Sequence, residues 1–336
     1  MSRQSNSLTV SGAIKEAIAL EMAANERVLV LGEDVATYGG VFGATDGLVD
    51  QFGKARVRDT PIAEMTFTGM GVGLAMAGYR PIVEIMFVDF IGSCLEQIYN
   101  AMAKIPYMSG GNMRIPMVVK TAAGCIGAAA QHSQCLWGTF AHLPGMRVVV
   151  PSCPYSAKGL MTSAIRSDDP IIFIEHKALM RRKLNAFDAV EPDVTSAAYE
   201  MPLGKAHVVL PGSDVTIVSL AKGVQDSVAA ARKLLKEDIS AEVVDLRSVV
   251  PLDIEAIIGS TRRTGRLLIV DEDYLSFGLS AEIMARVIES STPGVAPAMR
   301  RLATPDVPIP AAKTLEVAVL PDVDDIVAGA KALVAS

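Results

Sequence analysis

The chain has 336 residues, of which 50% are hydrophobic and only 20% are charged, and its formal net charge is −6. This length allows two domains that each bury a core, and the acidic balance argues against nucleic acid as a partner. No apolar run is long enough to span a membrane, and the N-terminal residues lack the apolar core of a signal peptide. We therefore expect a cytoplasmic protein without a membrane partner, and the excess of apolar residues predicts a large buried subunit interface.

The first half of the chain alternates β-branched runs with helical patterns, which is typical of α/β layering with a parallel sheet. The predicted strands are 27–31, 81–85, 116–120, 147–150 and 170–174, and the predicted helices are 10–24, 63–78, 89–104 and 154–166. Residues 105–114 and 121–146 are predicted to be long loops, and loops of that length inside a compact domain usually carry function.

The second half shows the same alternation after a polar, irregular stretch. Its predicted strands are 214–220, 241–246 and 266–271, and its predicted helices are 224–237, 253–260 and 278–290. Asp253 is the predicted N-cap of the second of these helices. We therefore predict an α/β protein with two layered domains and mainly parallel sheets, comprising residues 1–185 and 203–336 with a linker at 186–202.

The cysteines and histidines form no pattern that is typical of a metal site. We expect reduced, buried thiols at all four cysteines, which are Cys94, Cys125, Cys135 and Cys153. Of the histidines, His142 is predicted to be structural, and His176 and His207 are expected at ordinary surface or strand positions. The remaining one, His132, lies in a polar cluster, Gln-His-Ser-Gln, within a Gly/Ala-rich loop.

A second candidate is Glu64, which opens an almost wholly apolar run. An ionised carboxylate is costly to bury, so Glu64 must find a partner or a proton. Taken alone, such a glutamate is more often structural, and a loop histidine such as His132 is often satisfied by the neighbouring backbone. The glycines of the apolar run lie inside the predicted helix rather than in a turn after a strand, so they favour close helix–helix packing over dinucleotide binding; they are Gly69, Gly71, Gly73 and Gly78.

The chain resembles the β subunit of thiamine-diphosphate-dependent E1 components of 2-oxo-acid and acetoin dehydrogenase complexes. The resemblance is carried by the segment around Glu64, by the cluster around His132, and by residues 84–90 and 107–111 between them. The resemblance runs from about residue 8 to the C-terminus. It implies a pyrimidine-type thiamine-diphosphate domain followed by a transketolase C-terminal-like domain. It also implies an α₂β₂ heterotetramer with an E1 α subunit, in which pyruvate or acetoin is cleaved and the acetyl group passes to the lipoyl group of an E2 acyltransferase.

The resemblance further implies roles for particular residues. Glu64 is expected to bind the cofactor by hydrogen-bonding its aminopyrimidine ring, which promotes deprotonation of the cofactor. His132 is expected to face the reaction centre and to assist reductive acyl transfer to the lipoyl group. Met86 and Phe90 are expected to pack against the aminopyrimidine, although a Met or Phe at such positions is also an ordinary core residue.

The Gly-Asp-Gly sequence with which thiamine enzymes hold Mg²⁺ and the diphosphate is absent, and the chain has no Gly-Asp dipeptide. The implication is that the partner α subunit holds most of the Mg²⁺ site. A potassium loop of some relatives matches five positions here, but a serine replaces an acidic residue in it, so we assign no metal ligand to this chain. The five positions are Met117, Ala164, Ile165, Ser167 and Asp169.

Two other functions stay open from the sequence. The chain could be the pyrimidine-binding half of a split transketolase-like enzyme, although the region around His132 lacks the basic residues that bind sugar phosphates. It could also be a non-catalytic scaffold subunit, which the presence of both Glu64 and His132 argues against. The choice between pyruvate, acetoin and a branched-chain 2-oxo acid is not determined by these residues.

Overall fold

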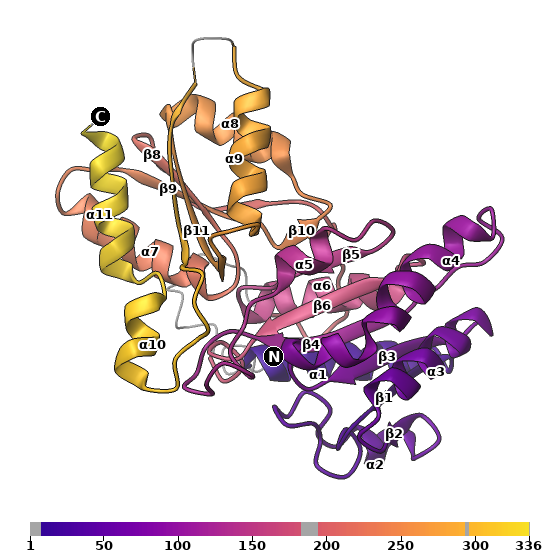
Figure 1. The fold of residues 1–336 in the computed structure, drawn as a ribbon. Coiled ribbons are helices and arrows are strands. Elements are labelled where there is room, and N and C mark those ends of the chain that lie inside the picture. Colours follow the sequence, from indigo (N-terminus) through magenta and orange to yellow (C-terminus); the bar gives the residue numbers. More distant parts are fainter. Residues whose placement is uncertain (1–7, 183–193, 293–295, 336) are drawn as a thin grey trace.

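The computed structural model describes residues 8–182, 194–292 and 296–335. It confirms the predicted fold class, because two α/β units are each built around a mostly parallel sheet (Figure 1). The predicted boundary at residue 185 lies outside the described residues, as does most of the first half of the linker. Residues 194–202 form no helix or strand.

The first sheet has seven strands in the order β10-β5-β6-β4-β3-β1-β2, and all neighbours are parallel except β10 and β5. Strands such as β1 and β4 are buried along their whole length, as expected for a parallel sheet that is covered on both faces. The strands are β1 (Val28–Gly32), β2 (Val57–Asp59), β3 (Arg80–Ile85), β4 (Val118–Ala123), β5 (Arg147–Val149), β6 (Ile171–His176) and β10 (Ser248–Val250).

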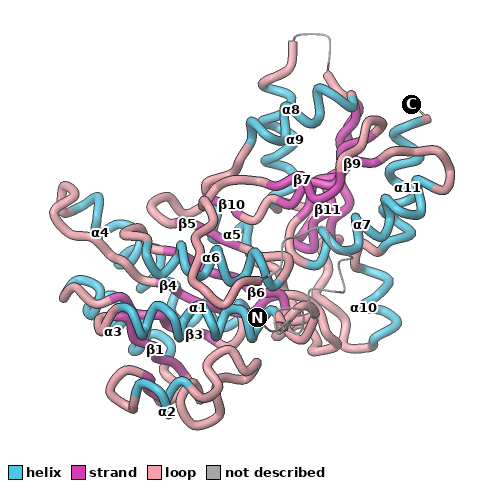
Figure 2. The backbone as a smooth tube through the Cα atoms, turned by 180° about the vertical axis from the view of Figure 1, so that it is seen from behind, coloured by secondary structure: helices cyan, strands magenta, loops and turns pink. Residues whose placement is uncertain are grey.

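Two helices cover the back of this sheet, where α1 packs along α6 (Figure 2). The threonine before α1 caps it by accepting a hydrogen bond from the Gly12 N–H at 3.1 Å. On the other side, α3 packs against β3. The helices of this unit are α1 (Val10–Ala24), α2 (Leu48–Phe52), α3 (Glu64–Met76), α4 (Ala103–Met108), α5 (Trp137–Ala141) and α6 (Pro154–Arg166).

The predicted helix at 89–104 is not continuous. A 3₁₀ segment (Val88–Cys94) and a π segment (Gln97–Met102) precede α4, and α4 continues to Met108 through Pro106, where a loop was predicted. Pro106 is tolerated because it follows the π segment, where the regular α-helical hydrogen-bond ladder is already interrupted.

The second sheet has five strands in the order β12-β11-β8-β9-β7, and only β7 is antiparallel to its neighbour. Helices α7 and α11 pack together on one face, and α8 and α9 pack together on the other (Figure 1). The elements are β7 (His207–Leu210), β8 (Val215–Ser219), β9 (Ala241–Asp245), β11 (Arg266–Tyr274), β12 (Ala298–Thr304), α7 (Lys222–Leu235), α8 (Ile254–Thr264), α9 (Leu279–Glu289), α10 (Lys313–Val319) and α11 (Val323–Val334).

Three details differ from the sequence predictions. The short strand β10 leaves the second half of the chain and pairs with β5 of the first sheet. Asp253 occupies the predicted N-cap position of α8, but its carboxylate makes no capping hydrogen bond and accepts one from the Ala206 N–H at 3.2 Å instead. Gly71 serves helix–strand rather than helix–helix packing, since a Cβ at this position would lie 2.6 Å from the Val83 side chain of β3.

The hydrophobic core of the first unit continues into the second. One cluster of buried residues runs from α1 and β1 through β6 to side chains of β8, β9, β11 and α9, and a separate cluster lies between the second sheet and helices α7 and α11. The two units therefore share buried apolar surface. Across the described residues, no helix is both long and apolar enough to cross a bilayer.

Candidate active site

The candidate residues gather at the carboxyl edge of the first sheet, which is where open α/β sheets bind ligands. Glu33 follows β1, Met86 and Phe87 follow β3, and Lys177 follows β6. Residues 124–136, here called the His132 loop, follow β4. Four strand ends thus deliver chemically distinct side chains to one side of the sheet.

Glu64 is the first residue of α3, as predicted, and its side chain is half-buried. Its neighbours Ile62 and Met65 are 84% and 56% exposed, so the surface around this carboxyl is apolar and open. Large exposed apolar side chains of this kind mark a surface that another molecule covers.

A second carboxyl, that of Glu33, lies close to Glu64 and was not among the predicted site residues. Burial, and then the negative charge of Glu64, raise the pKa of Glu33. Its buried Oε1 atom has no hydrogen-bond partner among the described residues. A raised pKa and an unpartnered oxygen both favour a proton on the Glu33 carboxyl. The only signal in the sequence was an acidic Glu-Asp pair directly after a fully buried strand.

Aromatic rings surround His132. The His132 ring centroid lies 5.0 Å from that of Phe87 and 5.4 Å from that of Phe90, both in edge-to-face geometry. Phe87 also packs against Phe42 at 5.6 Å. The structure therefore brings together two predicted residues, Phe90 and His132, and adds Phe87, whose place in the site the sequence pattern did not indicate.

The segment 86–94 links the two catalytic candidates. At the C-terminal end of this segment, burial and the nearby charge of Glu64 raise the pKa of the Cys94 thiol to about 11. At its near end, Phe87 and Phe90 contact His132, and Met86 is half-buried where β3 ends. Glu64 and His132 thus approach one segment from its two ends, while the predicted cofactor contacts of Met86 and Phe90 stay predictions.

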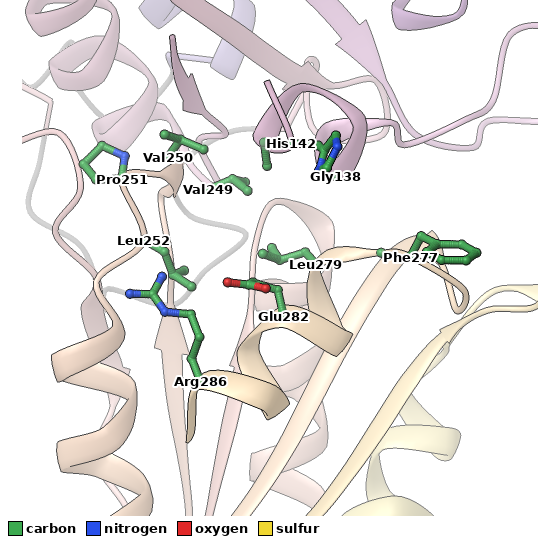
Figure 3. Close-up of a pocket in the computed structure, with 12 residues that line it drawn as sticks. Gly138, His142, Val249, Val250, Pro251, Leu252, Phe277, Leu279, Glu282 and Arg286 are labelled. Atoms are coloured by element: carbon green, nitrogen blue, oxygen red, sulfur yellow. The ribbon is translucent and has the colours of Figure 1, made fainter. Parts of the chain in front are cut away.

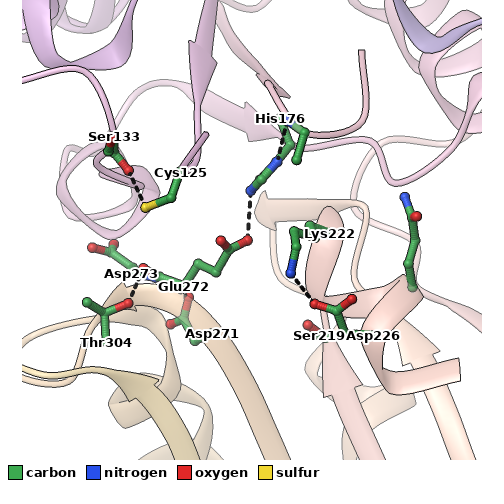
Figure 4. A network of polar contacts seen from close by, with 12 residues as sticks. Cys125, Ser133, His176, Ser219, Lys222, Asp226, Asp271, Glu272, Asp273 and Thr304 are labelled. Carbon is green, nitrogen blue, oxygen red and sulfur yellow. Dashed lines mark hydrogen bonds and ion pairs between the residues drawn. The ribbon is translucent and has the colours of Figure 1, made fainter. Parts of the chain in front are cut away.

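The His132 loop is closed at its base by its own hydrogen bonds. The Gly124 N–H donates to the Gln134 carbonyl at 3.1 Å, and the Cys125 thiol donates to the Ser133 carbonyl at 3.1 Å (Figure 4). The Gln134 amide donates to Asp89 at 2.8 Å, which ties the loop to the segment 86–94. A long loop was predicted for 121–146; the structure is irregular at 124–136 and 142–146, while 121–123 belong to β4 and 137–141 form α5.

Beneath the site, three charged side chains are buried on neighbouring strands. Lys120 Nζ of β4 lies 3.1 Å from Glu84 Oε2 of β3 and also forms an ion pair with Glu175 of β6. Burial raises the pKa of Glu175. Burial would lower the pKa of Lys120, but the two carboxylates outweigh it and raise that pKa. This Glu84–Lys120–Glu175 triad was not anticipated, because each residue sits singly in an apolar strand.

A second buried network joins the two domains. The His176 imidazole lies 2.7 Å from the Glu272 carboxylate of β11 (Figure 4). The Trp137 indole donates to Asp271 at 3.0 Å. His176 lies in a strand, as expected, but its burial and its ion pair were not anticipated. Its pairing partner is 96 residues away, so local sequence could not reveal it.

Cys135, His176 and Glu272 are the group of possible metal ligands found among the described residues, with ligand atoms within 4.8 Å of one another. Both imidazole nitrogens are already engaged, however. Nδ1 accepts from the Ala178 N–H at 3.2 Å, so Nε2 carries the proton and donates to Glu272. A histidine that binds a metal through one nitrogen normally donates a hydrogen bond through the other, whereas neither nitrogen of His176 is free for a metal. These three residues therefore fit a hydrogen-bonded contact between the domains rather than a metal site.

The segments that match a potassium loop of some relatives already accept hydrogen bonds from the protein itself. Arg80 Nη1 donates to the carbonyls of Ile165 and Ser167 at 3.0 and 2.8 Å, and Arg80 Nη2 pairs with Asp168 at 2.6 Å. The Met117 and Ala164 carbonyls accept backbone N–H groups at 2.9 and 3.3 Å. A guanidinium ion among these oxygens repels a second cation, so this arrangement does not fit potassium.

A cavity of about 520 Å³ lies at the junction of α5, β10 and α9 (Figure 3). His142, Pro251, Glu282 and Arg286 line it, and Phe277 stands at its rim with 98% of its surface exposed. His142 is exposed at this cavity, and its structural role stays a prediction. None of the predicted catalytic or cofactor-binding residues lines this cavity, so it is separate from the site described above.

Comparison with known proteins identifies the family. Residues 6–183 match the transketolase pyrimidine-binding domain, and residues 204–326 match the transketolase C-terminal domain. The acetoin:2,6-dichlorophenolindophenol oxidoreductase subunit beta of Cupriavidus necator is 40% identical, over 96% of both chains. The chain belongs to the β subunits of 2-oxo-acid and acetoin dehydrogenases.

Other members of this E1 β family act in different complexes. Pyruvate dehydrogenase E1 component subunit beta-1 of Arabidopsis thaliana is 41% identical over 96% of this chain and 88% of its own. The 2-oxoisovalerate dehydrogenase subunit beta of Bacillus subtilis is 43% identical over 90% and 91%. Among solved structures, a split gene transketolase in an inactive beta4 tetramer superposes with a TM-score of 0.79 at 22% identity, over 98% of both chains. This last likeness shows the fold alone.

Proposed function

We propose that this E1 β subunit works with an α subunit as an oxidoreductase that cleaves pyruvate or acetoin and transfers the acetyl group to the lipoyl group of E2. The observation that carries the proposal is the Glu33–Glu64 pair beside the segment 86–94, at the sheet edge where such enzymes bind their cofactor. Thiamine diphosphate, when bound, supplies the nucleophile for the substrate's keto carbon.

Glu64 would hydrogen-bond a ring nitrogen of the cofactor and share a proton with it. Its place at the opening of α3 exposes the carboxyl toward the sheet edge, and the neighbouring Glu33 supports this role. Burial and the charge of Glu64 raise the pKa of Glu33, so Glu33 holds a proton more readily than an isolated carboxyl. A carboxyl that is poised in this way is suited to general acid–base work.

His132 would move or orient a proton during acyl transfer. Phe87 and Phe90 contact the imidazole with their rings, which fixes its plane and leaves its nitrogens available for hydrogen bonding. Met86 and Phe90 would supply apolar walls for the flat pyrimidine ring. These side chains bind and orient, and they exclude water from the site once a partner covers it.

The partner α subunit would supply most of the groups that bind Mg²⁺ and the diphosphate, since this chain contains no Gly-Asp dipeptide. The exposed apolar face around α3 supports an interface there, in an α₂β₂ tetramer. Its large side chains are Ile62, Met65, Met70, Met76 and Tyr79. The E2 acyltransferase as acyl acceptor and a cytoplasmic location are likewise proposals.

Two alternative functions fit these residues less well. A transketolase half that binds sugar phosphates would need basic side chains around the site, but the His132 loop contains no lysine or arginine. A scaffold subunit would not need the two neighbouring carboxyls of Glu33 and Glu64. Pyruvate, acetoin and branched-chain 2-oxo acids stay open, because relatives of all three kinds are 40–43% identical to this chain.

Partner dependence tests the proposal directly. We expect the purified chain to bind thiamine diphosphate with Mg²⁺ only weakly and to show no turnover. With the α subunit, calorimetric titration should give tight binding, and kcat/KM for pyruvate, acetoin and 2-oxoisovalerate should rank the substrates. A micromolar or tighter site on the chain alone would contradict the two-subunit proposal, and turnover of sugar phosphates by the complex would favour the transketolase alternative.

A further inference from the structure

Lys177 lies directly behind the His132 loop and has no part in the function proposed so far. It follows the last residue of β6, and only 6% of its surface is exposed. Its N–H donates to the Ala123 carbonyl at the end of β4, at 2.9 Å. The side chain therefore starts from the rigid edge of the sheet, which is the kind of support that holds a functional group in one place.

The Lys177 ammonium makes two contacts that converge on His132. Nζ donates a hydrogen bond to the backbone carbonyl of His132, and it lies 4.9 Å from the centroid of the Phe87 ring. Phe87 in turn packs edge-to-face against the His132 imidazole, with an interplanar angle of 75°. The first contact fixes the backbone of His132, and the second acts on its ring through Phe87.

Burying the Lys177 ammonium costs folding free energy. Burial lowers the pKa of Lys177, and the groups that face it oppose the shift without cancelling it; these are Asp89, Cys135, Cys125 and Glu272. A lysine whose pKa is lower in the folded chain than in the unfolded chain reduces stability at every pH below its unfolded value. Stability therefore does not account for a lysine at this position.

The neighbour of Lys177 fixes it from the other side. His176 donates from Nε2 to Glu272 at 2.7 Å and accepts the Ala178 N–H at Nδ1, so its ring and the backbone around it are held in place. A continuous set of contacts thus runs from β11 of the second domain through His176 and Lys177 to the His132 loop, and its first part, the His176–Glu272 contact, is visible in Figure 4.

We propose that Lys177 is a positioning residue that holds the His132 imidazole in place for acyl transfer to the lipoyl group. This inference rests on the proposed function of His132. Lys177 touches the backbone of His132 and the face of Phe87, so it acts through these two residues and need not contact the substrate. A displacement of the imidazole by about 1 Å is enough to cost roughly a hundredfold in rate.

The experiment compares Lys177→Met, Lys177→Arg and His132→Ala in the assembled enzyme with its α subunit. For Lys177→Met we expect the rate with lipoylated E2 to fall about ten- to a hundredfold, while the rate with an artificial electron acceptor changes about twofold or less. Hydrogen exchange of residues 126–134 should become faster. The thermal midpoint should stay the same or rise, because a costly buried charge is removed. Lys177→Arg should restore most of the E2-dependent rate, because it keeps a cation and its donors.

Lys222→Met is the matched control. Lys222 is a half-buried lysine of the same junction, but it pairs with Asp226 and its pKa is raised, so its loss should lower the thermal midpoint without changing the ratio of the two rates. The Lys177→Met/His132→Ala double variant should be no worse than His132→Ala alone. A wild-type rate ratio and wild-type exchange in Lys177→Met would overturn the proposal, as would a loss of stability with equal losses in both assays. Absence of lipoyl transfer in the wild-type enzyme would instead refute the proposed function, and the exchange measurement would still report on the Lys177 contact.

Discussion

The two sheets have the same layered architecture but use their carboxyl edges differently. At the edge of the first sheet, the ends of β1 and β3 present Glu33, Met86 and Phe87 beside an open, apolar surface. At the edge of the second sheet, Asp245 accepts from the Ser152 hydroxyl at 2.5 Å, and Asp271 accepts from the Trp137 indole. The second edge is therefore filled by the first domain.

This difference shows how one α/β architecture can serve either binding or assembly. The crevice at the carboxyl edge binds ligands in open α/β sheets, but here the second crevice is packed with hydrogen-bonded side chains of the other domain. The two edges meet at His176 and Glu272. What remains open is the β1–β3 side of the first sheet. We expect substitutions at the open edge to change activity, and substitutions in the buried ion pairs beneath it and in the carboxylates of the filled edge to change stability.

The largest effect is expected at the open edge, for Glu64→Gln. If the Glu64 carboxyl promotes deprotonation of the cofactor, hydrogen–deuterium exchange at its reactive carbon should slow by about 10²–10⁴ in the assembled enzyme. The thermal midpoint should change little, because Glu64 is half-buried and opens a helix without capping it. Wild-type exchange in this variant would show that Glu64 is only structural.

The next effect concerns the sheet beneath that edge, for Lys120→Met. Removing the cation leaves Glu84 and Glu175 buried without it, and breaking a buried ion pair in this way costs about 3–5 kcal/mol of unfolding free energy. Denaturant unfolding measures this loss. Lys158→Met is a matched control, because Lys158 is equally buried but its partner Glu16 is one-third exposed and can be solvated by water. Equal losses in the two variants would contradict the prediction.

The smallest effect is expected at the filled edge and depends on pH. Burial and the neighbouring Asp271 raise the pKa of Asp273 to about 7, well above that of an unfolded aspartate. The ionised carboxylate therefore costs stability, and this cost appears as the pH rises from about 4 through 7. We expect Asp273→Asn to stabilise the protein by about 2 kcal/mol at pH 8 and to have little effect at pH 4.

Asp306→Asn should behave in the opposite way. Hydrogen bonds from Ser276 lower the pKa of this exposed carboxylate, so its contribution is stabilising above the pKa of an unfolded aspartate and is lost as the pH falls. The variant should lower the thermal midpoint at pH 8. If Asp273→Asn shifted the midpoint equally at both pH values, the pH-dependent cost at the filled edge would be refuted.

Many of the longer elements were predictable from the sequence, but strand β12 and helix α11 were not predicted. Helices α1, α3 and α6 lie at the predicted positions, as do the buried strands β1, β3, β8 and β9 within a few residues. Strands β2 and β10 have three residues each, which is too short for a periodic signal. The predicted helix at 89–104 is divided among three types of helical turn.

The sequence by itself determined the fold class, the family and the candidates Glu64 and His132. Hydrophobic periodicity and local motifs are properties of contiguous residues, so they can be read along the chain. Only the tertiary structure decided that Glu33 lies beside Glu64, that Phe87 and Lys177 hold His132, and that Arg80 occupies the predicted potassium loop. These contacts join residues that are 31 to 87 positions apart in the sequence, and several depend on parallel strands that end at one edge of the sheet. The burial of each side chain and the charges around it are therefore set by the assembled sheet rather than by neighbouring residues in the sequence.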